Sequence, residues 1–371
     1  MSTNKDEKID KEQEKLQASL DKNPRDHFND ITTHPYKIST GSLTLDLEMG
    51  GGVPNSIVRC AGESETGKSS FALNVAKIFL QEKNRRAIYF LSDKDLSETL
   101  IARCGVKFVD DVEKWEDGTC YIVRTNVYEM VLNTINTLVK DRQTSKSYLF
   151  ILDSMDNLAP KAKLEVEDFS DVNRLGGTGA ISAHFFQCYN ILLPRLGHTV
   201  IMISQFRDTI NASQRQAPIH KQMSTSGGRA IEHAVSWAFE FLPALNSKDD
   251  MFWEAEPYKS KKIGHNCIIQ FKKTTNEKTG NKVKYPIVYN RLDGNSIWIE
   301  REIFNILLLN GQIKAKASWL EISDFLLEEI HKIDKDFPPK IQGEDKFVTL
   351  LMEKPKLSQY LYKMAKETLL N

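Results

Sequence analysis

Residues 62–69 read G-E-S-E-T-G-K-S and carry the clearest chemistry in this chain. They fit the pattern G-x-x-x-x-G-K-[ST], in which backbone amides turn inward around a polyphosphate. Lys68 would bring a positive charge to the β- and γ-phosphates, and Ser69 would offer a hydroxyl to Mg²⁺. The segment therefore predicts a polyphosphate site. Its predicted binding residues are Gly62, Glu63, Ser64, Glu65, Thr66, Gly67, Lys68, Ser69 and Ser70.

The residues on both sides of this loop support the interpretation. Residues 56–61 form a short apolar segment that is typical of a buried strand, and residues 71–80 carry apolar side chains at helical spacing. A strand, a glycine-rich turn and a helix are the context that the motif requires. The helix would direct its positive N-terminal end at the anion.

Further apolar segments, separated by helical patterns, predict the fold class. They indicate an α/β protein with a mostly parallel sheet and helices on both faces. Ligands of such sheets bind at the carboxyl ends of the strands. Asp93, Asp153 and Gln205 follow three of these segments, so we expect them to share one site with the phosphate loop. The predicted strands are residues 56–61, 87–91, 148–152, 199–204, 267–271 and 285–289.

The chain divides into three parts by composition. Residues 1–35 are rich in charged side chains and predict either a solvated tail or a helical arm that docks on another subunit. Residues 36–300 hold the α/β core, and residues 301–371 change to amphipathic helical patterns that predict a small helical C-terminal domain. The expected C-terminal helices are residues 302–310, 318–330 and 356–370.

Composition excludes several classes of protein. The 371 residues have a formal net charge of zero and a hydrophobic content of 40%, which supports a proper core. No apolar run is long enough for a membrane span, and the N-terminal residues contain no apolar signal region. The five cysteines lack CxxC spacing, and the histidines form no ligand pairs. We expect a cytoplasmic protein with reduced thiols and neither a zinc cluster nor a membrane partner.

Three polar residues at strand ends suggest distinct roles. Asp153 can hold Mg²⁺ opposite Ser69, directly or through water. Asp93 could orient an attacking water as a general base; the alternative is a helix N-cap or loop acid, and Asp95 competes for the role. Gln205 can hydrogen-bond the γ-phosphate and report its loss to the segment that follows.

That segment, residues 206–226, is long, polar and basic, with Asp208 as its one acid. A loop of this kind suits a nucleic-acid backbone; the alternative is a flexible surface loop. A second loop, residues 165–179, carries Arg174 near its far end, behind a cluster of acids. The predicted DNA-binding residues are Arg174, Arg207, Arg215, Lys221, Gly227, Gly228 and Arg229.

Residues 36–295 resemble the RecA family of recombinases. The entry segment at residues 38–47, the phosphate loop, the Asp153 strand end, and the segments at 202–207 and 224–231 follow in that family's order. The chain is similar in particular to the phage-encoded branch, the recombinases of T4-like phages. The C-terminal helical region fits that branch better than it fits the bacterial protein.

The resemblance implies an ATP-dependent DNA recombinase that uses ATP and Mg²⁺. Such a protein forms a helical filament on single-stranded DNA, pairs it with a homologous duplex, and hydrolyses ATP when DNA stimulates it. The implied partners are single- and double-stranded DNA, further copies of the chain in a homo-oligomeric filament, and single-strand-binding and recombination-mediator proteins. The implied location is the host cytoplasm if the protein is phage-encoded.

The resemblance also implies residue roles. Asp93, Gln205 and Lys68 fall at the catalytic positions, and Ser69 and Asp153 at the magnesium site.

Outside these positions, Lys272 or Lys273 falls where family members reach the neighbouring subunit's ATP; which of the two acts stays open. Tyr289 resembles an aromatic residue near the nucleotide base, and the N-terminal segment would be the subunit-docking arm.

The chain departs from the family pattern at the catalytic acid, which affects the expected rate of ATP hydrolysis. The catalytic acid of the family is usually Glu, whereas Asp93 is shorter by one methylene, about 1.5 Å at full extension. We therefore expect slow hydrolysis. Two alternative functions remain at this point: a RecA-like helicase motor, and a weakly hydrolysing, ATP-dependent mediator that binds single-stranded DNA.

Overall fold

The structure is a computed structural model. It describes residues 3–22, 35–141, 145–165, 178–208, 223–224, 228–244, 250–253, 261–289, 291, 294 and 296–370.

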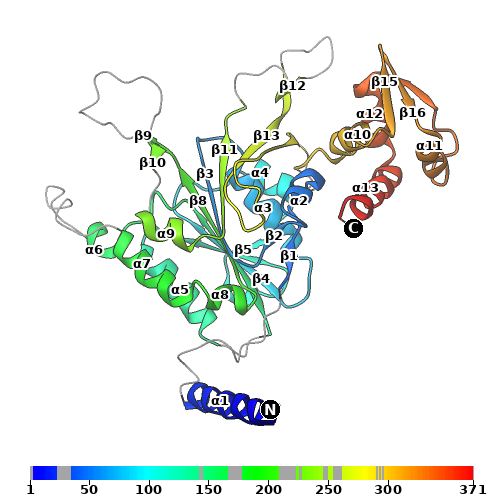
Figure 1. Cartoon of the computed structure of the whole chain (residues 1–371). Coiled ribbons are helices and arrows are strands. Elements are labelled where there is room, and N and C mark those ends of the chain that lie inside the picture. The colour runs from blue at the N-terminus through cyan, green and yellow to red at the C-terminus, as the bar shows by residue number, and fades with distance from the viewer. Residues whose placement is uncertain are drawn as a thin grey trace, which may run out of the picture.

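A large central sheet forms the core of the molecule (Figure 1). In the part of the chain that is described it has ten strands: β3 (Ile57–Gly62), β4 (Arg85–Leu91), β5 (Phe108–Val109), β6 (Cys120–Arg124), β7 (Ser147–Asp153), β8 (Thr199–Gln205), β11 (Trp237–Leu242), β12 (Met251–Trp253), β13 (Lys262–Lys273) and β14 (Lys282–Val288). Their order is β12-β13-β11-β3-β8-β7-β4-β6-β5, and β14 pairs with β13. The strands from β11 to β5 run parallel, and β13 is antiparallel to its neighbours. The predicted mostly parallel α/β sheet is confirmed.

The strand order brings the carboxyl ends of four strands into one row. Gly62 at the end of β3 pairs with Gln205 at the end of β8. In the same row, Asp153 at the end of β7 pairs with Leu91 at the end of β4. Because β8 also pairs with β7, the phosphate loop and the expected acids emerge at the same edge.

Helices cover both faces of the sheet (Figure 1). One face packs against α3 (Lys68–Phe79) and α4 (Glu98–Cys104), and the other against α5 (Tyr128–Val139) and α7 (Thr178–Tyr189). Phe71 and Phe79 of α3 are 1% and 0% exposed. Burial of such a side chain stabilises the fold by about 1.5–3 kcal/mol, which fixes the helix after the phosphate loop against the sheet.

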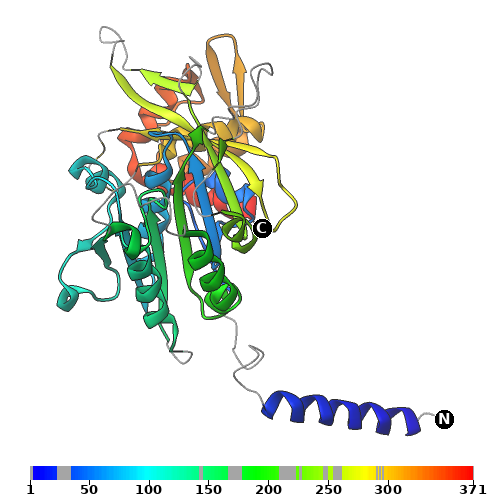
Figure 2. The same ribbon diagram turned by 90° about the vertical axis from the view of Figure 1, so that its left-hand side faces the viewer.

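Shorter elements complete the part up to residue 250. They are β1 (Lys37–Ile38), α2 (Leu43–Glu48), β2 (Val53–Pro54), the 3₁₀ helix η1 (Val112–Lys114), α6 (Lys161–Leu164), α8 (Leu192–Arg195), β9 (Arg207–Asp208), β10 (Met223–Ser224) and α9 (Gly228–Ala234). The N-terminal helix α1 (Thr3–Lys22) lies apart from the sheet and its helices (Figure 2), and Leu16 is 62% exposed. Its docking on another subunit stays a prediction.

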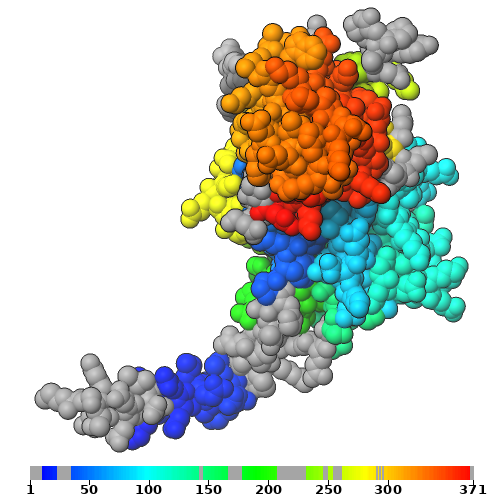
Figure 3. Space-filling view, turned by 90° about the vertical axis from the view of Figure 1, so that its right-hand side faces the viewer, coloured from blue at the N-terminus to red at the C-terminus, as the bar shows by residue number. Residues whose placement is uncertain are grey.

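The C-terminal region forms a lobe at one end of the molecule (Figure 3), and its hydrophobic core also includes Phe252 of β12 and Val288 of β14. Its elements are α10 (Ile299–Leu309), β15 (Ile313–Lys316), β16 (Trp319–Ile322), α11 (Asp324–His331), β17 (Lys340–Gln342), α12 (Glu344–Glu353) and α13 (Pro355–Leu370). The expected helices at 302–310 and 356–370 are confirmed.

The helix expected over residues 318–330 is wrong in its first part. Trp319–Ile322 is a strand that pairs with β15 on one side and β17 on the other. Leu320 and Ile322 are buried, whereas Trp319 is 48% exposed, which is the alternation of a half-buried strand. The helix begins only at Asp324, where the Ser323 hydroxyl caps it.

Among the described helices, none combines the length and the apolar character that a membrane crossing requires.

A buried carboxylate joins the C-terminal lobe to the core. Glu302 of α10 is 1% exposed. Its carboxylate accepts hydrogen bonds from the Ser42 hydroxyl at 2.5 Å and from the backbone N–H groups of Leu43 and Thr44 at 2.9 and 3.1 Å. These donors sit at the N-terminus of α2, where backbone N–H groups lack partners within the helix. Burial raises the pKa of Glu302 above its ordinary value of 4.5, although these hydrogen bonds oppose the shift.

We expect Glu302→Gln to flatten the pH dependence of stability. Because the pKa of Glu302 is higher in the folded chain than in the unfolded one, the folded protein binds more protons above pH 4.5. The free energy of unfolding therefore falls as the pH rises from that value through the folded-state pKa. Urea unfolding across a pH series should show a shallower fall for Glu302→Gln. An identical slope in both proteins would contradict this assignment.

Candidate active site

The phosphate loop lies between the end of β3 and the start of α3, and two of its glycines are required by geometry. Gly67 has a φ of +99°, a conformation that disfavours other residues. A Cβ on Gly62 would lie 2.4 Å from the carbonyl oxygen of Phe241. The backbone can make this turn only without side chains at these two positions, as the motif predicted.

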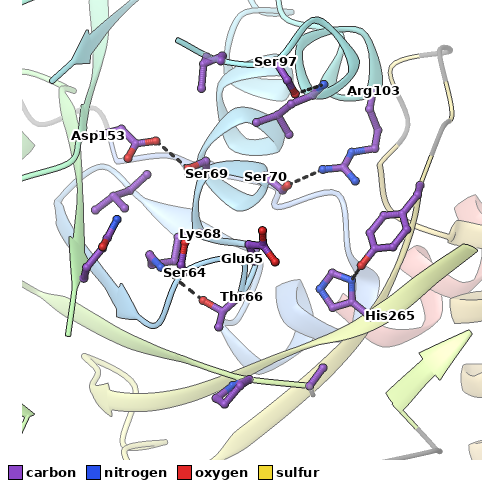
Figure 4. Close-up of a pocket in the computed structure, with 18 of the residues that line it drawn as sticks. Ser64, Glu65, Thr66, Lys68, Ser69, Ser70, Ser97, Arg103, Asp153 and His265 are labelled. Atoms are coloured by element: carbon purple, nitrogen blue, oxygen red, sulfur yellow. Dashed lines mark hydrogen bonds between the residues drawn. The ribbon is translucent and has the colours of Figure 1, made fainter. Parts of the chain in front are cut away.

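The Lys68 ammonium lies inside the loop (Figure 4). It donates to the carbonyl oxygen of Gly62 at 3.0 Å and to that of Glu63. Burial lowers the pKa of Lys68, and the nearby Asp153 carboxylate opposes that shift. A cation held by neutral carbonyls in a partly buried loop is a strong attractor for an anion that offers better partners.

Ser69 and Asp153, which the sequence predicts to hold Mg²⁺, contact each other directly (Figure 4). The Ser69 hydroxyl donates to Asp153 Oδ2 at 2.7 Å. This leaves the lone pairs of the Ser69 oxygen and the second carboxylate oxygen as acceptors. Hard oxygen donors of this kind are what Mg²⁺ prefers, so the residues present fit the ion.

Sequence reasoning missed Tyr89, which is fully buried in β4. Its hydroxyl donates to Asp153 Oδ2 at 2.5 Å, the same oxygen that accepts from Ser69. Burial, followed by the Asp153 charge, raises the pKa of Tyr89 well above 10.0, so the phenol stays a donor. The sequence signal was a tyrosine within an otherwise apolar buried strand, where a hydroxyl needs a partner.

A cavity of about 580 Å³ brings the expected site residues together. The phosphate loop, Asp153, Gln205 and Asp93 all line it. The N–H of Gln205 donates to Asp156 Oδ2 at 2.6 Å, which holds the end of β8 in place.

The surroundings of Asp93 help to choose between a general base and the alternatives given above, a helix cap or a role taken by Asp95. Asp93 is exposed and follows the end of β4. The cap of α4 is Ser97, which accepts from the N–H of Leu100, so Asp93 does not cap that helix. The competing acid, Asp95, pairs with Arg124 at 2.9 Å and does not line the cavity. The placement favours Asp93, and its catalytic role stays a prediction.

The end of the cavity away from Asp153 contains residues that the sequence analysis did not find. Arg103 of α4 and His265 of β13 line it together with Tyr289, which was expected there. Arg103 Nη2 donates to the Ser70 hydroxyl at 2.9 Å (Figure 4). The Tyr289 hydroxyl shares a hydrogen bond of 2.6 Å with His265 Nδ1. No local motif marks Arg103 or His265, because they reach the cavity only through the packing of α4 and β13.

Lys272 and Lys273 do not line this cavity. They line a second one of about 520 Å³. Lys272 pairs with Glu240 at 3.0 Å, and Lys273 donates to the carbonyl oxygens of Glu232 and His233 at 3.0 and 3.2 Å. Within one chain they are therefore apart from the phosphate loop, and their expected contact with a neighbouring subunit's nucleotide stays a prediction.

The predicted DNA-binding residues fall mostly beyond the described part of the chain. Arg174, Arg215, Lys221 and Gly227 lie outside the described residues. The backbone of Arg207 belongs to β9, which pairs with β10 through Ser224, and Gly228 and Arg229 begin α9; the side chains of Arg207 and Arg229 are not described. The two ends of segment 206–226 are thus joined directly after Gln205.

Comparison with known proteins matches the sequence to one family. The model of the RecA N-terminal domain family matches residues 18–250, more than half of the chain. The chain is 25% identical to Protein RecA of Mesoplasma florum over 314 residues, covering 82% of this chain and 87% of that protein. It is 23% identical to Protein RecA of Nostoc punctiforme over 345 residues, covering 90% and 80%. It is 24% identical to Protein RecA of Nitratiruptor over 328 residues, covering 85% and 89%.

The chain therefore belongs to the RecA family. Membership carries the coarse functional class with it: an ATP-binding and DNA-binding protein of recombination and repair, with a RecA-like ATPase core. The family model ends at residue 250, so the C-terminal lobe lies outside the match.

We expect Tyr89→Phe to weaken the magnesium dependence of nucleotide binding while preserving the fold. The change keeps the buried ring and removes the hydroxyl that holds Asp153 Oδ2. A hydrogen bond to a charged group contributes about 1.5–3 kcal/mol, so the Mg²⁺ concentration for half-maximal ATP binding should rise about tenfold. Calorimetric titration of ATP at a series of Mg²⁺ concentrations measures this. Tyr121→Phe, in neighbouring β6, is the matched control; an unchanged requirement in Tyr89→Phe would contradict the role.

Proposed function

We propose that this protein is an ATP-dependent DNA recombinase that forms a filament on single-stranded DNA and pairs it with a homologous duplex. One observation carries the proposal. The cavity that holds the phosphate loop and the Ser69–Asp153 pair is also lined by Gln205, after which the chain enters the basic segment 206–226. Gln205, which lines the nucleotide cavity, is thus followed directly by the predicted DNA-binding segment.

Each residue at the phosphate end has a distinct task in the proposed reaction. Lys68 exchanges its carbonyl partners for phosphate oxygens, while Ser69 and Asp153 hold Mg²⁺. When bound, Mg²⁺ neutralises the charge that develops on the transferring phosphoryl group. Asp93 orients the attacking water from the rim of the cavity. Its short side chain is the reason to expect slow turnover.

Coupling to DNA runs through Gln205. Its backbone is fixed by Asp156, so its side chain can respond to a γ-phosphate while β8 stays in place. The β9–β10 ladder follows directly and transmits a shift to both ends of segment 206–226. This is linkage between two sites: ATP strengthens DNA binding only as far as it favours the DNA-competent state.

The proposed filament supplies the remaining groups. Lys272 or Lys273 would reach the nucleotide of an adjacent copy, and α1 would dock on that copy. Lys273 also bonds to the C-terminal carbonyls of α9, the helix that follows segment 206–226, so an adjacent nucleotide could act on that segment through it. Arg174, in the loop of residues 165–179, would add a contact to DNA.

Finer features of the assignment are proposals too. The sequence resemblance and composition support dividing the chain into domains at residues 35 and 300. The resemblance also suggests a phage-encoded protein of the host cytoplasm that works with mediator and single-strand-binding proteins. The relatives named above are called Protein RecA and do not select a branch.

We expect single-stranded DNA to stimulate phosphate release by the full-length chain. Lys68→Ala should lower the stimulated rate roughly 10²-fold, because the transition state loses its main cation. Asp93→Glu should raise the rate roughly tenfold by extending the carboxylate toward the water. Asp95→Glu is the matched control and should change little. Absence of stimulation, together with no gain in Asp93→Glu, would remove Asp93 from the mechanism and favour a weakly hydrolysing mediator.

The segment after Gln205 makes a separate prediction. The double variant Arg207→Ala, Arg215→Ala should bind oligonucleotides more weakly and with a flatter salt dependence. Each lost phosphate contact lowers the slope of log K against log salt by about 0.7 on a single strand, hence by about 1.4 for two contacts. Lys107→Ala, Arg124→Ala removes two exposed charges elsewhere and should leave the slope unchanged. Equal slopes in both double variants would exclude segment 206–226 from the DNA site.

A further inference from the structure

The second cavity, of about 520 Å³, is lined by the residue that directly follows Gln205. Gln205 lines the nucleotide cavity, and Phe206 lines the second one. Arg59 of β3 and Glu232 of α9 also line the second cavity. This cavity therefore touches both the strand that leads into the phosphate loop and the helix that follows segment 206–226.

Arg59 places a buried charge in this cavity. It is 5% exposed and pairs with Met202 of β8 and with Ala238 of β11. Because side chains alternate along a strand, Arg59 shares the face of Ile57, which packs in one cluster with Ile231 of α9. A charge removed from water in this way needs opposite charges close to it.

Two carboxylates from different elements compensate the Arg59 charge. Burial lowers the pKa of Arg59, and the nearby Glu232 and Asp156 carboxylates oppose that shift. Glu232 belongs to α9, whereas Asp156 follows the end of β7. A guanidinium carries its N–H donors in a planar fork, so it can attract carboxylates from two directions at once.

The two carboxylates lie on opposite sides of segment 206–226 in the chain. Asp156 Oδ2 accepts from the N–H of Gln205 at 2.6 Å, directly before the segment begins. Glu232 lies in the helix that begins after the segment ends, and its carbonyl oxygen accepts from Lys273 at 3.0 Å. One guanidinium thus lies near acids that flank both ends of the segment. A shift of either acid changes how strongly Arg59 attracts the other.

We infer that Arg59 is a positioning residue that couples Gln205 to segment 206–226, by linking Asp156 before the segment to Glu232 after it. The inference rests on the proposed function, because it requires that ATP strengthens DNA binding. It gives Arg59 no contact with nucleotide or DNA. Loss of Arg59 should therefore leave the two binding sites intact and remove the coupling between them.

Two measurements on the full-length chain separate coupling from binding. The first is the affinity for a fluorescent single-stranded oligonucleotide with Mg²⁺ and either ADP or ATP, expressed as the ratio of the two dissociation constants. The second is the affinity for ATP without DNA, from calorimetric titration. In the unsubstituted protein the ratio should be about ten or more. Arg59→Met, which keeps an unbranched stem and removes the charge, should lower the ratio to about two or less and change ATP affinity less than about twofold.

Three further variants complete the experiment. Arg59→Lys keeps the charge but not the planar fork, so it should restore part of the ratio. Glu232→Gln changes an exposed side chain and should lower the ratio severalfold, which keeps the test decisive if Arg59→Met does not fold. Arg86→Met is the matched control: Arg86 lies near the start of β4 in the same sheet and pairs with Asp117 at 2.9 Å. It should leave the ratio unchanged.

The outcomes distinguish the inference from the proposed function. Coupling that persists in Arg59→Met, or in Glu232→Gln, would overturn the link across the segment and leave the proposed function standing. Weaker binding of ATP, and of DNA with both nucleotides, in Arg59→Met would show that Arg59 only supports the fold, and would also overturn the inference. If the unsubstituted protein itself binds DNA equally with ATP and ADP, the proposed coupling of ATP to DNA fails, and the inference fails with it.

Discussion

The hydrogen bond between Ser69 and Asp153 is the contact on which the site depends, because it joins the helix of the phosphate loop to a strand 84 residues later. Neither residue can reach the other unless β3, β8 and β7 are neighbours in parallel register. That register follows from the apolar strands β7 and β8, whose interior side chains are buried on both faces and whose carboxyl ends carry Asp153 and Gln205. The sheet therefore fixes the relative positions of Ser69 and Asp153, and the side chains of these residues and of the phosphate loop provide the groups that would bind the nucleotide and Mg²⁺.

A second consequence of the same register is that the phosphate loop and the start of the predicted DNA-binding segment lie at one edge of the sheet. Gln205 ends β8 beside Gly62 and begins the path to segment 206–226. The buried Tyr89 of β4 also holds the Asp153 carboxylate in place, because its hydroxyl donates to the same oxygen as that of Ser69. With the rest of the site held in this way, a bound γ-phosphate would need to move only the Gln205 side chain and the segment that follows it. The proposed coupling between ATP and DNA requires such a local response.

Much of the core was predictable from sequence because local patterns determine it. The phosphate loop, the buried strands and the acids at their ends are each visible within a few residues, and a parallel sheet brings them together. The contacts of Tyr89, Arg103 and His265 were not predictable, since they join residues far apart in the chain; the tyrosine in an apolar strand signalled only that its hydroxyl needs a partner. The strand at Trp319–Ile322 was mistaken for a helix because its apolar residues run on into those of α11. From the sequence, Glu302 would be predicted as an ordinary surface residue of a helix, because its burial depends on the packing of α2 against it.

The central claim is that a triphosphate at this edge changes how the chain holds DNA. The most direct measurement is the affinity of the purified full-length protein for a fluorescent single-stranded oligonucleotide, with Mg²⁺ and ATP, with Mg²⁺ and ADP, and without nucleotide. The account predicts tight binding with ATP and at least tenfold weaker binding in the other two conditions, which corresponds to a coupling free energy of about 1.4 kcal/mol or more. Equal affinity in all three conditions would contradict it.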